Sequence, residues 1–254
     1  VTELILIAQD VTKYGYDLYK EYKIVDLIKN LSKIEGLKWI RLLYCYPELI
    51  TDELISEIDS NPKVCKYIDI PLQHVSDNIL KKMNRKGDKN KIISVIKKLR
   101  NCKNYISIRS TFIVGFPGET RKEFNELKQF LIDFKLNNVG FFAYSKEEGT
   151  KAYNFSHQIP KFIKNIRVKK LQKIQKNVII ENNKALINKT LLCVCEKIEN
   201  DIVTLRSEFN SPEIDTLIYA DYKEGVEVGK FYNVLITDIL DADIDLIGEI
   251  INET

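Results

Sequence analysis

The stretch that most constrains the fold is residues 109–120, RSTFIVGFPGET. An apolar run ends in a Gly/Pro turn, and a glutamate and a threonine follow it. The pattern predicts a buried strand that stops at Gly115, a tight turn of bare backbone, and a helix in which Glu119 and Thr120 form the first positions. Ligands of parallel α/β sheets bind at this edge, where strands give way to helices. The stretch therefore predicts a strand, a turn and a helix, and marks a candidate site.

Residues 1–150 alternate strand-like and helix-like segments five times. Strands are predicted at residues 3–8, 38–44, 65–70, 105–114 and 138–144, the first of them buried and the third ended by Pro71. Helices are predicted at residues 19–34, after Thr51, at 76–83 with Ser76 as the cap, at 90–100 behind Asp88, and at 119–136. This alternation indicates a parallel sheet with helical crossovers. A doubly wound sheet and a fragment of a β/α barrel both fit it.

The last third of the chain follows a different pattern. One long basic helix is predicted over residues 161–187, and we expect it to bridge two domains. Short strands are then predicted at residues 191–195, 202–206, 214–219, 232–237 and 246–251. Such a series is typical of a small antiparallel β-barrel or sandwich. The predicted domains are therefore residues 1–187 and residues 188–254.

The charge divides at the same place. Residues 188–254 hold 5 Lys/Arg and 15 Asp/Glu, a net charge of −10, whereas residues 1–187 hold 34 and 21, a net charge of +13. Opposite charges suggest two domains with different partners, although a solvated surface in a lysine-rich chain also explains the positive part.

The cysteines bear on the compartment. Five cysteines with no Cys-x-x-Cys pair indicate a reducing cytoplasm. Cys193 and Cys195 would share one face of a strand, where buried small side chains are favoured over a metal or redox role. No apolar run approaches the roughly 18 residues of a membrane span.

Polar residues follow the predicted strands and outline an amide-rich pocket at the carboxyl edge of the sheet. They are Gln9, Asp10, Tyr44 to Pro47, Gln73, His74, Gly115 to Glu119, Tyr144 and Ser145. The chain has no dinucleotide fingerprint, phosphate-binding loop or nucleophile elbow, which argues against a self-contained hydrolase or kinase. His74 is interpreted as a general base or, preferably, as a hydrogen-bonded histidine at the pocket rim.

Several motifs resemble the methylthiotransferase branch of the radical S-adenosylmethionine (SAM) enzymes. They are LILIAQD (4–10), RLLYCYP (41–47), YIDIPLQH (67–74), STFIVGFPGET (110–120) and FAYSKEEGT (142–150). SPEID (211–215) resembles the C-terminal TRAM domain of that family. The resemblance covers essentially the whole chain. It implies an α/β fold: a partial radical-SAM (β/α) barrel with five of six units, followed by a small antiparallel β-barrel TRAM domain.

Within this family, Gln9-Asp10, residues 44–47 and residues 70–74 are similar to the branch that adds a methylthio group to the β-carbon of an aspartate in a small-subunit ribosomal protein. The tRNA-modifying branch would have Gln-Asn, Ser-His-Pro and Gln-Ser-Gly at these places. The acidic tail agrees, because it repels phosphate and attracts a basic protein. Expected partners are thus a basic ribosomal protein and, through it, the ribosome, without direct nucleic-acid binding or a membrane. A tRNA adenosine methylthiotransferase and a non-catalytic protein-binding module remain alternatives.

The resemblance implies SAM and two [4Fe–4S] clusters as cofactors of the full-length enzyme. The family's first β/α unit carries the Cys-x-x-x-Cys-x-x-Cys ligand set, and no such triplet occurs here. We therefore expect no metal ligands in this chain, assign no catalytic residue, and expect the chain to be the C-terminal part of a longer enzyme that is inactive alone.

The resemblance also implies contacts with the cofactor. Gln9 and Asp10 are expected to line the methionyl amino group, and Gln73 and His74 to lie near the carboxylate and ribose. The remaining expected contacts are Ile113 and Gly115 against the adenine, Glu119 as anchor of the turn, and Tyr144 closing the adenine side. Competing interpretations make Ile113 a core residue and Glu119 only a helix-start carboxylate. Substrate binding is expected at Asp241, Asp243 and Asp245.

Overall fold

Five parallel strands follow one another in chain order in a computed structural model that describes residues 1–240 and 244–254. They are β1 (Glu3–Leu6), β2 (Trp39–Leu42), β3 (Tyr67–Gln73), β4 (Ser107–Val114) and β5 (Asn138–Ala143). Ladders join β1 to β2 and β3 to β4 to β5, and a bridge from Ile40 to Val64 links the two groups. This sequential order is that of a β/α barrel, whereas a doubly wound sheet reverses its order at a switch point. The predicted partial barrel is confirmed.

Helices cover one face of the sheet. They are α2 (Ile24–Leu31), α3 (Asp52–Ser60), α5 (Lys89–Arg100) and α6 (Arg121–Phe134). Alternate strand residues such as Ile40, Ile68 and Phe112 are fully buried in one core with these helices. Because strand side chains alternate between faces, Arg41 and Asp69 fall on the other face.

Several predicted elements differ in the structure. The first predicted strand is shorter and less buried than expected: Ile5 of β1 is 37% exposed because β1 lies at the sheet edge, and Ile7, beyond the end of β1, is 63% exposed. Residues 19–34 do not form one helix, since Lys20 is left-handed (φ 59°) and separates α1 (Tyr16–Tyr19) from α2. β3 continues through Pro71, where the ladder with β4 is interrupted and no N–H is needed.

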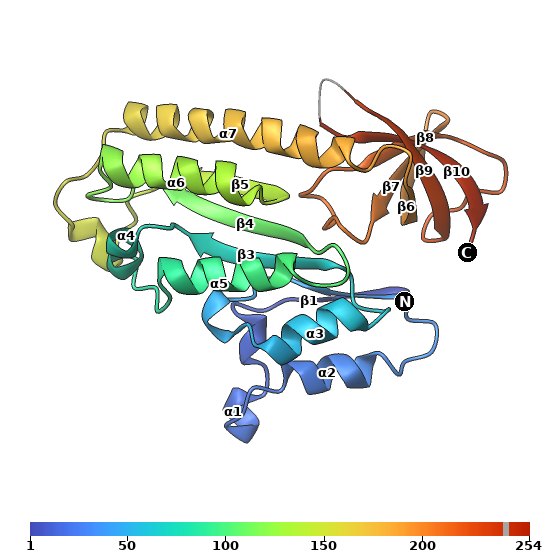
Figure 1. Cartoon of the computed structure of the whole chain (residues 1–254), viewed down its shortest axis with the longest axis horizontal. Helices are drawn as coiled ribbons and strands as arrows, with labels where there is room; N and C mark the ends of the chain where they lie inside the picture. The colour runs from blue at the N-terminus through green and yellow to red at the C-terminus, as the bar shows by residue number, and fades with distance from the viewer. Residues whose placement is uncertain (241–243) are drawn as a thin grey trace.

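One long helix, α7 (Lys161–Lys184), packs along β5 and α6 and leads into the second barrel (Figure 1). The exposed lysines of α7 make this helix strongly polar. No described helix is long and apolar enough to cross a membrane.

The second barrel is closed, which excludes the sandwich alternative. Its strands are β6 (Thr190–Glu199), β7 (Ile202–Ser207), β8 (Ile218–Asp221), β9 (Phe231–Ile239) and β10 (Leu246–Glu253), in the order β10-β8-β7-β6-β9. All pairs are antiparallel except β10 with β8, which departs from the prediction. The reason is geometric: a ring of five strands cannot alternate direction throughout. Cys193 and Cys195 are buried in this barrel, as predicted.

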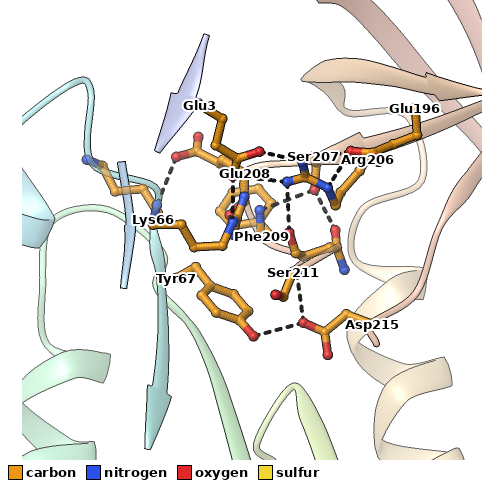
Figure 2. A network of polar contacts seen from close by, with 12 residues as sticks. Glu3, Lys66, Tyr67, Glu196, Arg206, Ser207, Glu208, Phe209, Ser211 and Asp215 are labelled. Atoms are coloured by element: carbon orange, nitrogen blue, oxygen red, sulfur yellow. Dashed lines mark hydrogen bonds and ion pairs between the residues drawn. The ribbon is translucent and has the colours of Figure 1, made fainter. Parts of the chain in front are cut away.

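The second barrel docks against the amino-terminal ends of the sheet strands through a polar network (Figure 2). Arg206 of β7 forms ion pairs with Glu3 of β1 and with Glu196, the latter at 2.7 Å. The Tyr67 hydroxyl donates to Asp215 at 2.9 Å. The opposite, carboxyl-terminal ends of β3 and β4 point away from this interface (Figure 1).

Candidate functional site

The candidate site lies at the carboxyl ends of the strands. Six predicted cofactor-binding residues belong to the ends of β3, β4 and β5 or to the turns after them: Gln73, His74, Ile113, Gly115, Glu119 and Tyr144. Gln9 and Asp10 follow β1, the strand at the opposite end of the sheet from β5. The structure therefore divides the predicted residues into a large group and a pair.

Glu119 holds the turn after β4. Its Oε2 accepts the N–H of Gly115 at 2.7 Å, and its Oε1 lies 2.5 Å from Arg167 Nη1 on α7. Gly115 has φ +75°, and a Cβ at this position would lie 2.2 Å from Lys164 Cγ. Both the backbone conformation and the approach of Lys164 require glycine. That Gly115 also admits an adenine remains a prediction.

The start of α6 is capped by other residues. Thr120 N–H donates to Glu123 Oε2 at 2.7 Å, and the two residues form a capping box. Glu119 precedes this cap and directs its carboxylate toward the turn and α7. The interpretation of Glu119 as only a helix-start carboxylate is therefore wrong.

His74 lies next to the Glu119 carboxylate and is fully buried. Its Nδ1 accepts the N–H of Ser76 at 3.0 Å, and its Nε2 lies 3.6 Å from Glu119 Oε2. Because Nδ1 accepts, the neutral ring carries its proton on Nε2, facing the carboxylate. Ser76 was predicted to cap α4 (Asp77–Lys82) with its side chain, but that side chain makes no capping bond. A direct contact between His74 and a bound molecule remains a prediction.

A hollow of about 480 Å³ opens beside the turn, and we call it the β4 hollow. Gln73, Ile113 and Phe116 line it. Ile113 is half-buried at this wall rather than a member of the core. The Tyr144 ring meets the Phe116 ring edge-on at 5.1 Å, and burial raises the pKa of the Tyr144 phenol. The lining thus joins an apolar, aromatic part to two amides, Gln73 and Asn84, and to three basic side chains, Lys82, Arg85 and Lys151.

A second hollow of about 230 Å³ lies near the end of β2, and we call it the tyrosine hollow. Tyr22, Tyr46 and Asp10 line it. Asp10 is buried and caps the short helix η1 (Val11–Lys13), with Oδ2 3.3 Å from Lys13 Nζ. Gln9 is exposed and lines neither hollow. The two hollows adjoin, because Asn84 and Arg85 line both.

The predicted substrate-binding aspartates are only partly described. Asp241 and Asp243 lie outside the described residues. Asp245 Oδ1 accepts the N–H of Leu217 at 2.8 Å, which ties the segment before β10 to the segment before β8. Asp245 therefore supports the barrel, and its contact with a substrate remains a prediction.

The described residues contain no group of three or more His, Cys, Asp or Glu arranged to hold a metal. Cys45, Cys65, Cys193 and Cys195 are buried, and burial raises the pKa of their thiols, that of Cys65 to about 12. Iron–sulfur clusters bind thiolates, which these positions disfavour at neutral pH. The residues present do not fit an iron–sulfur cluster.

Sequence reasoning missed basic residues at the site, among them Lys164, Arg167 and Arg85. Lys164 and Arg167 are three positions apart, so they share a face of the predicted long helix, but the sequence does not show which turn that face contacts. Arg85 follows the predicted end of a helix at Met83 and carried no motif signal. Its place at the site depends on contacts with Tyr46 and Pro71, which are distant in the sequence.

Comparisons with known proteins agree with this architecture. A profile of the radical SAM superfamily matches residues 2–131, and a TRAM domain profile matches residues 187–251. The chain is 49% identical over 249 residues to "Ribosomal protein uS12 methylthiotransferase RimO" of Thermoanaerobacter sp. (strain X514), and 48% identical over 253 residues to the protein of that name from Clostridium botulinum (strain Hall). These alignments cover 98% and 100% of this chain and 56% of each relative, so the chain spans little more than half their length.

A solved structure shows the same type of fold. Coproporphyrinogen III oxidase (HemN) from Escherichia coli, a radical SAM enzyme, superposes with a TM-score of 0.50 at 10% identity, over 73% of this chain and 51% of that one. The profile match, the sequential parallel strands and the small closed barrel agree: the chain belongs to the radical SAM superfamily and carries a TRAM domain after the barrel.

Proposed function

We propose that this chain forms the cofactor-binding and substrate-docking part of a cytoplasmic methylthiotransferase that modifies an aspartate β-carbon of ribosomal protein uS12. The observation that carries the proposal is the 49% identity, over 98% of the chain, to a relative of that name. Residues 1–187 would form the radical SAM part and residues 188–254 the TRAM part.

The β4 hollow fits the adenosyl part of SAM. Its volume of about 480 Å³ suits a small molecule. Ile113 and Phe116 offer an apolar wall, and the Gln73 amide offers a hydrogen-bonding group. When bound, SAM supplies the radical chemistry. The chain's own contribution is to position it: Glu119, fixed by Arg167, holds the turn that borders the hollow.

The acidic tail supports docking of a basic protein. A net charge of −10 on residues 188–254 attracts a basic partner and repels RNA phosphates. This negative charge disfavours the tRNA-modifying alternative. A non-catalytic protein-binding module remains compatible with this charge, and binding of SAM separates it from the proposed enzyme part.

Binding measurements with purified chain test the proposal. We expect saturable binding of SAM by equilibrium dialysis, and calorimetric binding of ribosomal protein uS12 that is stronger than binding of tRNA at equal salt. Reversing the charge at Asp241 and Asp243 should weaken uS12 binding, whereas Asp245 is left intact because it supports the barrel. Binding of uS12 without SAM would leave the module alternative, and preference for tRNA would overturn the assignment of the substrate.

A further inference from the structure

Arg85 occupies the border between the two hollows. It lies in the segment that joins α4 to α5 and lines both the β4 hollow and the tyrosine hollow. Its place is therefore at the carboxyl edge of the sheet, next to the surface that the proposed function assigns to bound reactants.

The Arg85 guanidinium is held in place but not neutralised. It lies over the Tyr46 ring, 4.1 Å from the ring centroid, and Nη2 donates to the Pro71 carbonyl at 2.9 Å. Among the described residues, no carboxylate forms an ion pair with it. By contrast, four arginines with side chains at most 14% exposed each pair with a carboxylate: Arg41, Arg109, Arg167 and Arg206. Arg85 thus keeps an oriented positive charge with donors to spare.

The Arg85 guanidinium suits a planar carboxylate. Asp10 and Glu48 line the tyrosine hollow together with Lys13 and Lys86, and Glu48 Oε1 already accepts the N–H of Gly87 at 2.8 Å. The positive charges of Lys13 and Lys86 offset these two carboxylates, so the Arg85 charge is left for a ligand. A single carboxylate can pair with the planar guanidinium through two N–H donors. Stacking on Tyr46 removes part of the entropy cost of that pairing.

We propose that Arg85 binds a carboxylate of one of the two reactants, the acceptor aspartate side chain or the methionyl carboxylate of SAM. The inference rests on the proposed function for the identity of the reactants, and it adds the residue that would recognise them. Arg85 lines both hollows, whereas His74, predicted to lie near the cofactor carboxylate, is fully buried and lines neither.

The test uses the whole chain and a probe that needs no catalysis. N-acetyl-aspartate methylamide is titrated into ¹⁵N-labelled chain while the Arg85 Nε–H signal is followed by NMR, and the asparagine analogue is titrated in parallel. We expect saturable chemical-shift changes with the aspartate probe. The affinity for the asparagine analogue should be lower by roughly tenfold or more. Arg85→Gln should abolish this preference and Arg85→Lys should reduce it, because lysine lacks the planar fork. Lys81→Gln, which removes an exposed charge that lines neither hollow, should keep it.

The same titrations with SAM and decarboxylated SAM identify the source of the carboxylate. A preference for SAM that disappears in Arg85→Gln assigns the site to the cofactor, and a preference confined to the aspartate probe assigns it to the acceptor. The inference is overturned if the wild type binds the aspartate and asparagine probes equally and also binds SAM and decarboxylated SAM equally. It is also overturned if a preference for the carboxylate survives Arg85→Gln. Failure of the proposed function would show separately, as absence of uS12 binding.

Discussion

Arg167 of α7 and Glu119 of the turn after β4 form an ion pair from which solvent is largely excluded, with side chains 14% and 0% exposed. The guanidinium also donates to the Glu119 backbone carbonyl at 3.0 Å. Since Glu119 in turn accepts the Gly115 N–H, one arginine of the linking helix fixes the turn at the candidate site. The helix that leads to the TRAM domain is thereby also part of the site's support.

Replacing Glu119 by glutamine should destabilise the fold. The variant keeps the side-chain shape but leaves the Arg167 charge without its partner, which costs about 3–5 kcal/mol for a buried pair. Urea unfolding measures the loss. The matched control is Glu126→Gln, whose pair with Lys89 is about one-third exposed and should cost less than about 1 kcal/mol. Equal losses in the two variants would contradict the role of Glu119.

Gly115→Ala should lower the free energy of unfolding by more than the left-handed backbone conformation alone explains. That conformation costs roughly 1–2 kcal/mol, and the contact of the new Cβ with Lys164 adds to it. Gly36→Ala is the control, because Gly36 has φ +76° and no atom lies within 4 Å of the place that its new Cβ would take. In a Lys164→Ala background the difference between the two glycine sites in unfolding free energy should shrink. An unchanged difference would show that Lys164 is not the obstacle.

Arg206→Ala should loosen the interface between the two barrels. It leaves Glu3 and Glu196 facing each other without their shared cation. Trp39 is the only tryptophan, and its ring meets Phe231 of the second barrel edge-on at 4.8 Å, so its fluorescence reports this interface. We expect a red-shifted emission and an earlier fluorescence transition in urea. Lys223→Ala, which removes an exposed pair with Glu249, should leave the emission unchanged.

The stability contributed by Asp215 should fall as pH rises. Burial raises the pKa of Asp215 in the folded state, although the bonds from Ser211 and Tyr67 and the Arg109 charge oppose the shift. A raised folded pKa means that the folded state holds its proton longer than the unfolded state. Stability therefore declines between the unfolded pKa of about 4 and the higher folded value.

Urea unfolding across this range, for wild type and Asp215→Asn, measures the effect: the wild type should lose stability relative to the variant as pH rises. Asp59→Asn serves as an opposite control, because hydrogen bonds from Asn104 and Lys103 lower the pKa of Asp59 and reverse the sign. A wild-type curve parallel to that of Asp215→Asn would refute the raised pKa.

Local sequence patterns were enough to predict most of the helices and strands. Thr51 and Asp88 cap the helices expected after them, because a cap and its N–H partner lie within three residues. The turn at Gly115 was likewise predicted from neighbouring residues, the Gly/Pro segment that follows the apolar run. Boundaries were missed where a long-range contact decided them: β3 runs through Pro71 because the partner strand β4 leaves that position unpaired.

The sequence by itself determined the alternation of strand and helix, the change to short strands after residue 187, the motifs of the superfamily and the acidic tail, because each resides in neighbouring residues or in composition. Only the tertiary structure decided that the sheet is sequential, that Glu119 faces Arg167 rather than its own helix, that His74 is buried, and that Arg85 stands between two hollows. These are contacts between residues tens of positions apart, and they depend on packing across elements that local periodicity does not encode.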